Sequence, residues 1–157
     1  HTPGHMCLYL EEEKLMFLGD HVLFDITPNI YYWSGVEDSL QDYLDSLIKI
    51  RNYEIETPFA AHRQNGTDIK RRIAEIIEHH ESRLAEIISI VKQEEGLNAQ
   101  EIAIRMSWAI PCKAWGDFPI IQRWFAMGEA IAHLDHLCQR KILSRDFEQQ
   151  QGKYYLL

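Results

Sequence analysis

Two short apolar runs near the start of the chain, residues 6–10 and 15–18, are separated by the acidic stretch EEEK. Runs of this length, rich in strand-compatible side chains and joined by a polar turn, predict a β-hairpin. The second run is followed at once by Gly19 and Asp20, so the hairpin delivers a carboxylate at the exit of its second strand. The start of the chain therefore belongs to a sheet, and an all-helical fold is excluded.

Helical periodicity dominates the part of the chain that follows. Apolar residues at steps of three and four predict a helix from Ser39 to about Arg51, and YEIETPFAA then predicts a strand that leads to His62. A long helix is predicted after Thr67, its expected N-cap, and Gly96 is expected to end it. Before the first helix, DITPNIYYWSG mixes turn residues with aromatic residues, which indicates an irregular loop that lines a site.

A second unit is predicted in the rest of the chain. It contains a helix around residues 99–108, the aromatic connector PCKAWGDFP, a helix across residues 125–138 and two short segments around Gly152. A run of helices followed by a terminal hairpin is typical of a winged-helix domain. We therefore expect an α/β protein with two domains, residues 1–96 and 97–157.

Composition narrows the function classes. With 157 residues, 46% of them hydrophobic, the chain can bury a core of its own. Residues 1–96 carry 9 Lys and Arg against 18 Asp and Glu, and residues 97–157 carry 7 against 6, so neither part has the basic surface that strong nucleic-acid binding requires. No apolar run approaches the roughly 20 residues that span a bilayer, so no membrane partner is expected. The three cysteines form no Cys-x-x-Cys pair, which favours a reducing, cytoplasmic location.

Residues 1–93 resemble the C-terminal half of the metallo-β-lactamase fold. The resemblance is carried by an ordered series of motifs, namely HTPGH, a strand hairpin, GDHVL, AAHR and a long helix. It implies part of an αββα sandwich of two sheets covered by helices, followed by the small winged-helix-like domain. HTPGHMCLYL and GDHVL are most similar to the glyoxalase-II-like group, and GEAIAHLDHLCQRKIL is similar to the last helix and turn of a winged-helix extension found in a subset of these hydrolases.

The resemblance also implies a dinuclear metal centre. Carried over by motif, His1 ligates the first metal ion, Asp20 bridges both ions and is the catalytic carboxylate, and His62 ligates the second ion. Imidazole and carboxylate groups suit zinc, the expected metal, with iron or manganese as alternatives. Such ions lower the pKa of a bound water and polarise a carbonyl or phosphoryl oxygen, which is the chemistry of a hydrolase.

Other side chains near these motifs are candidates for substrate contact. Arg63 is suited either to an anionic substrate group or to an ion pair with a neighbouring acid. His5 is expected to fix its loop rather than to bind metal, and His21 is expected to face solvent or to support Asp20 from behind. His80 falls on the apolar face of the long helix, where we expect it to pack.

The remaining ligands of the family, in a His-x-His-x-Asp-His motif, have no counterpart in this sequence. The nearest string is HLDH at residues 133–136, but Ile131 stands where the first histidine of the motif is required. We therefore expect His133 and His136 to be structural. The chain is expected to be a fragment of a longer enzyme, inactive alone, that self-associates through the sheet surface that the missing half leaves uncovered.

Hydrolysis of a small-molecule thioester or related ester is the function that the glyoxalase-II-like motifs imply. A single-strand RNA endonuclease of the same fold is the enzymatic alternative, because some members with a winged-helix tail act on RNA. A regulatory nucleic-acid-binding module is the third hypothesis, although the predicted wing offers few basic residues: Arg140, Lys141, Arg145 and Lys153.

Overall fold

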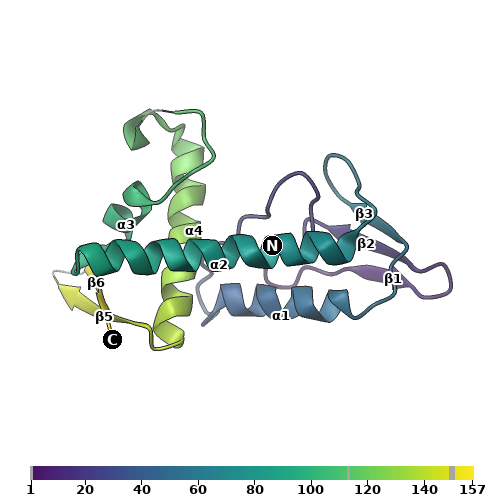
Figure 1. Cartoon of the computed structure of the whole chain (residues 1–157), viewed down its shortest axis with the longest axis horizontal. Helices are drawn as coiled ribbons and strands as arrows, with labels where there is room; N and C mark the ends of the chain where they lie inside the picture. Colours follow the sequence, from purple (N-terminus) through teal and green to yellow (C-terminus); the bar gives the residue numbers. More distant parts are fainter. Residues whose placement is uncertain (1, 113, 149–150) are drawn as a thin grey trace. The chain divides into compact units, whose positions relative to one another are not determined.

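A computed structural model describes residues 2–112, 114–148 and 151–157 of the chain. Within these residues the fold is mixed α/β, with four α-helices, one short 3-10 helix and two three-stranded sheets (Figure 1). The α/β class predicted from the sequence is confirmed.

The first sheet contains β1 (Leu8–Leu10), β2 (Leu15–Gly19) and β3 (Thr57–Ala60), in the order β1-β2-β3. β1 pairs antiparallel with β2, which confirms the predicted hairpin. β3 pairs parallel with β2, so the chain must cross from one end of the sheet to the other between them. The crossover contains the helix α1 (Ser39–Arg51), whose bounds agree with the sequence-based expectation.

The two faces of this sheet differ in their exposure to solvent. Successive side chains of a strand point to opposite faces, and in β2 Met16 and Leu18 are buried whereas Phe17 is 47% exposed. Leu8 and Phe59 pair with Phe17 from the two neighbouring strands and are also exposed, and the rings of Phe17 and Phe59 stack with centroids 5.3 Å apart. The sheet therefore presents an apolar outer face.

The long helix α2 (Ile69–Gln93) buries one stripe of side chains, which includes Ile73 and Ile76. The predicted N-cap at Thr67 is wrong by one residue, because the Asp68 carboxylate accepts the hydrogen bond from the backbone N–H of Arg71 at 2.9 Å. A carboxylate in this position satisfies an N–H group that the first turn of a helix leaves without a partner.

The second sheet contains three antiparallel strands, β4 (Leu97–Asn98), β5 (Leu143–Glu148) and β6 (Gln151–Leu156), in the order β4-β6-β5. Between β4 and β5 lie α3 (Ala99–Arg105) and α4 (Ile120–Gln139). The terminal hairpin predicted around Gly152 is confirmed. Helix α4 begins five residues earlier than predicted, and β4 was not predicted at all.

A capping box fixes the start of α3. The Asn98 side chain accepts from the N–H of Glu101 at 3.0 Å, and the Glu101 carboxylate accepts from the N–H of Asn98 at 2.8 Å. The core beneath it combines side chains from α2, α3, α4 and the second sheet, and its fully buried members include Ile87, Ile102 and Leu134.

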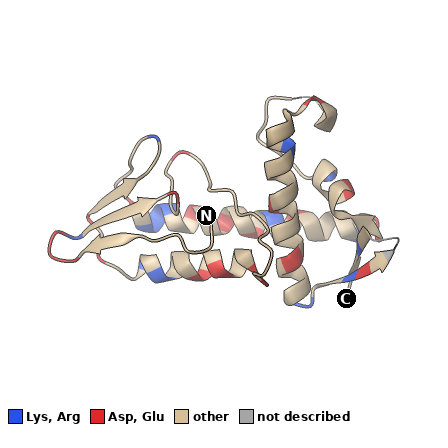
Figure 2. Cartoon of the chain, turned by 180° about the vertical axis from the view of Figure 1, so that it is seen from behind, with Lys and Arg blue, Asp and Glu red and all other residues tan. Residues whose placement is uncertain are grey.

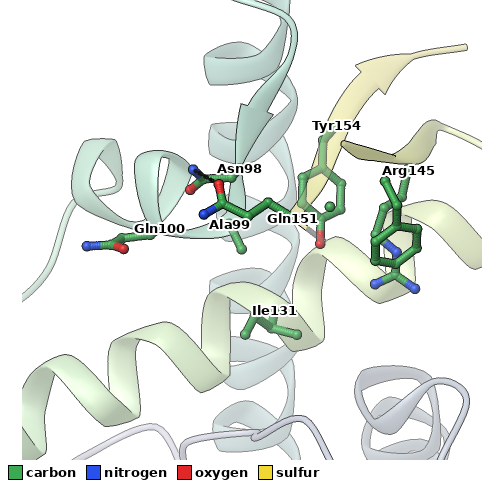
Figure 3. A pocket seen from close by; sticks show the side chains of 9 residues that line it. Asn98, Ala99, Gln100, Ile131, Arg145, Gln151 and Tyr154 are labelled. Atoms are coloured by element: carbon green, nitrogen blue, oxygen red, sulfur yellow. Dashed lines mark hydrogen bonds between the residues drawn. The ribbon is translucent and has the colours of Figure 1, made fainter. Parts of the chain in front are cut away.

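Contacts group the described residues into two compact units: residues up to Ile30 with Gln41–Glu81, and Tyr31–Leu40 with Ser82–Leu157. Both α1 and α2 contribute residues to each unit, and the domain boundary at residues 96 and 97 stays a prediction. Lys and Arg are spread along the elements of both units, and the longest run of them is Lys70, Arg71 and Arg72 near the start of α2 (Figure 2). In the part of the chain that the structure describes, no helix has the length and apolar character needed to cross a membrane.

Candidate functional site

Asp20 and His62 meet at one edge of the first sheet. Because β2 and β3 are parallel, their carboxyl ends lie side by side, and Asp20 follows β2 whereas His62 comes two residues after β3. The Nε2 atom of His62 lies 3.1 Å from Oδ1 of Asp20. The His62 side chain is 65% exposed and that of Asp20 is 30% exposed, whereas the Oδ1 atom of Asp20 that meets His62 is buried. Two of the three predicted metal ligands are therefore brought together; His1 lies outside the described residues.

A tight turn holds Asp20 in place. Gly19 adopts a φ of 55°, and the backbone N–H of His21 donates to the carbonyl of Leu18 at 3.1 Å. The backbone N–H of Ala61 donates to the carbonyl of Gly19 at 3.0 Å, which ties this turn to the end of β3. Residues other than glycine rarely adopt this backbone conformation.

The HTPGH motif forms a turn that carries His5 to the same place. The N–H of His5 donates to the carbonyl of Thr2 at 3.1 Å, and Gly4 has a φ of 82°, so residues 2–5 have the features of a type II turn with Pro3 in its second position. The ring of His5 packs on Gly19, because a β-carbon added there would fall 2.4 Å from its Nε2 atom.

His21 is buried behind this turn. It is only 6% exposed, which excludes the first of the two expected alternatives, a place facing solvent, and leaves the second, a place behind Asp20. Nε2 of His21 lies 3.0 Å from the hydroxyl of Ser46, and the hydroxyl of Tyr43 donates to the His21 carbonyl at 2.8 Å. Burial, and then the nearby His5, lower the pKa of His21 to about 4, whereas hydrogen bonding with the backbone of Ser46 acts in the opposite direction. The ring is therefore neutral at pH 7. Burial raises the pKa of Tyr43, which keeps its hydroxyl a donor.

Three further hydrogen bonds fix the loop that follows Asp20, and one of them joins it to the loop that carries His62. Arg72 on α2 donates from Nε to the carbonyl of Leu23 at 2.6 Å and from Nη2 to the carbonyl of Ile26 at 2.9 Å. The carboxylate of Asp25 accepts from the N–H of Gln64 at 3.3 Å, across from one loop to the other.

Gly66 contributes to the same junction. The ring of Phe24 lies so close that a β-carbon at Gly66 would be 2.2 Å from it. Within the second loop, the amide oxygen of Asn65 accepts from the N–H of Ala60 at 2.7 Å. Arg63, the residue after His62, is exposed and has a left-handed backbone with a φ of 64°.

Sequence reasoning missed the residues behind the site. Tyr43 belongs to the apolar periodicity of α1, and only the tertiary structure reveals that its hydroxyl meets His21. Ser46 and Arg72 carry no motif. The signal that was available is the NG dipeptide after His62, because Asn and Gly in succession indicate a tight loop.

The donor chemistry of the Asp20–His62 pair suits a borderline metal such as zinc, which binds carboxylate oxygen and imidazole nitrogen. Among the described residues, no group of three or more His, Cys, Asp or Glu side chains is arranged to hold a metal ion. The pair therefore supplies two donors of the correct type, fewer than the three protein ligands usual in a catalytic zinc site.

The remaining histidines of interest are buried, as expected. His80 is 1% exposed. In α4, Nδ1 of His133 lies 2.8 Å from the carbonyl of Glu129, and Nδ1 of His136 lies 3.0 Å from the Asp38 carboxylate. The HLDH string therefore has a structural role within the second unit.

Comparisons with known proteins agree with this arrangement. Residues 1–62 match the family described as the metallo-beta-lactamase superfamily, and residues 117–155 match the one described as metallo-beta-lactamase-like, C-terminal domain. The chain is 27% identical over 125 residues to the Beta-lactamase-like protein 2 homolog of Caenorhabditis elegans, which covers 77% of this chain and 40% of that protein. It is 33% identical over 103 residues to a protein of Aspergillus chevalieri named atrochrysone carboxyl ACP thioesterase, covering 63% of this chain and 31% of that protein.

A solved structure has the same fold over nearly the whole chain. The crystal structure of a beta-lactamase domain protein from Burkholderia ambifaria is similar with a TM-score of 0.87 and 26% sequence identity, covering 99% of this chain and 45% of that one. The chain thus spans less than half the length of each of these three proteins.

Proposed function

Because the chain belongs to the metallo-β-lactamase superfamily, we propose that the protein is a metal-dependent hydrolase of the glyoxalase-II-like group that cleaves a thioester or related ester. The observation that carries the proposal is the contact between Asp20 and His62, 3.1 Å apart at the ends of two parallel strands. A carboxylate and an imidazole from separate loops, held on a rigid sheet, are a suitable arrangement for a hydrolytic centre.

Two zinc ions are the metal content that we propose, with iron or manganese as alternatives. Asp20 would bridge them, His1 would hold the first and His62 the second. When bound, such ions supply an activated water and polarise the carbonyl under attack. Because the described residues offer two donors together, we propose that the 157-residue chain alone binds metal weakly and turns over no substrate.

Substrate class is supported by two observations. A relative that is 33% identical is named a thioesterase. Residues 1–96 carry twice as many acidic as basic residues, 18 against 9, and this net negative charge disfavours a polyphosphate such as RNA. Arg63 is exposed beside His62 and remains our candidate for an anionic group on a small substrate.

For residues 97–157 we propose a winged-helix-like domain that supports the catalytic part. The order β4, α3, α4, β5, β6 with a terminal hairpin supports this assignment. In a DNA reader, a helix such as α4 would have to present its side chains to a groove. Nine residues of α4 are buried instead, which disfavours the nucleic-acid module. A cytoplasmic location stays a proposal, consistent with three cysteines that form no disulfide.

The test compares two substrates on the full-length protein. A chromogenic acyl thioester and a single-stranded RNA oligonucleotide are assayed side by side, with Asp20→Asn as the control for contaminating activity. We expect thioester hydrolysis to be at least tenfold faster than RNA cleavage and to depend on Asp20. Faster cleavage of RNA would instead favour the endonuclease.

A further inference from the structure

We propose that Tyr43 and Ser46, neighbours on one face of α1, are positioning residues that set the place of Asp20 at the candidate site. The inference rests on the proposed function only in so far as it takes Asp20 and His62 as the working pair. Both residues act on that pair through His21.

His21 is held at its backbone and at its ring. The Tyr43 hydroxyl donates to the His21 carbonyl at 2.8 Å, and the Ser46 hydroxyl lies 3.0 Å from Nε2 of His21. Residues three apart on a helix share one face, so α1 presents both hydroxyls together. The Tyr43 ring also meets the His21 ring edge to face, with centroids 5.1 Å apart.

The hydrogen bonds of Ser46 determine which nitrogen of the His21 ring carries the hydrogen. The Ser46 hydroxyl donates its one hydrogen to the carbonyl of Tyr43 at 2.9 Å. A serine hydroxyl has a single hydrogen but two lone pairs, so toward His21 it must accept. His21 therefore carries its hydrogen on Nε2 and donates it to Ser46, which selects one ring orientation and one tautomer.

The hydrogen bonds that hold His21 also restrain Asp20, because the two residues are neighbours in the backbone. Asp20 is the only residue between Gly19 and His21, and both neighbours are fixed: the Gly19 carbonyl accepts from Ala61, and the His21 N–H donates to Leu18. The ring of His5 stacks on the ring of His21, with centroids 5.9 Å apart, and also packs on Gly19. Side-chain packing therefore restrains the turn in addition to its hydrogen bonds. We therefore expect a shift of His21 to displace Asp20 and to change its contact with His62.

Burial makes these two hydroxyls difficult to replace. Tyr43 is 5% exposed and His21 6% exposed, so water has little access to the carbonyl and the ring nitrogen that lose a partner. A buried polar group without a partner is costly, and local rearrangement is the expected relief. The rearrangement would be felt first in the three-residue turn that carries Asp20.

The experiment reads the Asp20–His62 contact directly by nitrogen NMR of the 157-residue chain labelled with nitrogen-15 in its histidine rings. The His62 signal is assigned with His62→Gln, and Asp20→Asn gives the full change expected when the carboxylate is lost. We expect Tyr43→Phe and Ser46→Ala each to move the His62 signal by at least a third of that change. Ser46→Thr, which keeps the hydroxyl, should restore the original position.

Tyr9→Phe is the matched control. Tyr9 also donates through its hydroxyl to a main-chain carbonyl, that of Glu54 at 2.7 Å, but at an exposed place. It should leave the His62 signal within a tenth of the Asp20→Asn change. If Tyr43→Phe does not fold, Ser46→Ala and Ser46→Thr carry the test.

Two outcomes would overturn the inference, and they differ. If Asp20→Asn moves the His62 signal but Tyr43→Phe and Ser46→Ala do not, the positioning role is wrong and the proposed site stands. If Asp20→Asn itself leaves the His62 signal in place, the working pair does not exist, and the positioning role falls together with the proposed site.

Discussion

The ring of Tyr31 lies directly against Gly128, so close that a β-carbon on Gly128 would be 1.8 Å from the ring. The same ring stacks on Trp124 one turn earlier in α4, with centroids 4.5 Å apart. Gly128 therefore has a packing function in the middle of a helix, where glycine is otherwise unfavourable. The segment after Ile30 is anchored to α4 at this point.

Gly128→Ala is expected to destabilise the protein. The helix gains about 1 kcal/mol from alanine. Displacing a ring that would lie 1.8 Å from the new β-carbon should cost the upper part of the usual range, about 2–3 kcal/mol, so we expect a net loss of about 1–2 kcal/mol. Chemical denaturation measures it. Gly116→Ala serves as control, since nothing lies within 4 Å of a β-carbon there. Equal stability of Gly128→Ala and the original chain would contradict the close packing.

Arg72→Lys is expected to loosen the loop that follows Asp20. A lysine cannot reproduce the two bonds from separate guanidinium nitrogens to the carbonyls of Leu23 and Ile26. We expect a loss of about 1–3 kcal/mol in the free energy of unfolding and faster hydrogen exchange in this loop. The neighbouring Arg71→Lys is the matched control, because that side chain is 74% exposed; a similar effect in both variants would exclude a specific role for Arg72.

The free energy of unfolding is expected to decrease when the pH is lowered, because of His21. Its pKa is about 4 in the folded protein, below its ordinary value of 6.5. Between these values the unfolded chain takes up a proton that the folded chain does not, so this contribution is complete above pH 6.5 and is lost as pH falls toward 4. The loss amounts to roughly 3 kcal/mol.

Denaturation of the chain and of His21→Gln across pH 4–7 isolates this contribution, because the other seven histidines are the same in both proteins. His5, Tyr43 and Ser46 face the ring and are unchanged in the variant. Parallel pH profiles for the two proteins would show that His21 is not held neutral.

Self-association through the outer face of the first sheet is a further expectation. Leu8, Phe17 and Phe59 are 62%, 47% and 36% exposed on this face, and exposed apolar patches of this kind mark interfaces. Sedimentation of the 157-residue chain should reveal dimers or larger species. Phe17→Ser with Phe59→Ser should weaken association at least tenfold, whereas Ile104→Ser, at an exposed apolar residue of α3, should not. A monomer at all concentrations would rule out this interface.

Asp20→Ala in the full-length protein is expected to abolish most of its activity. Removal of a bridging carboxylate leaves two cations facing each other without compensation, so metal content should fall below the expected two ions and turnover by about 100-fold or more. Elemental analysis and the thioester assay check both effects. An unchanged metal content together with unchanged turnover would exclude the bridging role.

Local sequence patterns predicted helices and strands better than they predicted which strands pair with each other. The bounds of α1 follow from the spacing of its apolar residues, and the hairpin follows from two apolar runs around EEEK. Strand β4 has only two residues, Leu97 and Asn98, and exists because it pairs with β6 more than fifty positions later. No local pattern can indicate a strand that short.

At the candidate site, too, the residues found by motif differ from those that depend on tertiary packing. Asp20 and His62 were identified by motif, whereas Tyr43, Ser46 and Arg72 act through hydroxyl and guanidinium contacts that depend on the packing of two helices. For His21 the sequence left two alternatives open, a place facing solvent or a place behind Asp20. Its burial depends on α1, which supplies its two hydrogen-bond partners.

The parallel register of β2 and β3 has a consequence for how the chain reaches its native state. The Asp20–His62 contact joins residues 42 positions apart, and it requires the crossover through α1 to close first. Non-local parallel pairing is slow to form, because the entropy of closing the loop is lost before any contact is gained. A one-residue slip would also exchange the two faces of β3 and bring its buried Pro58 to the outside. A ligand bound by both side chains would therefore stabilise only the strand alignment in which the two loops meet.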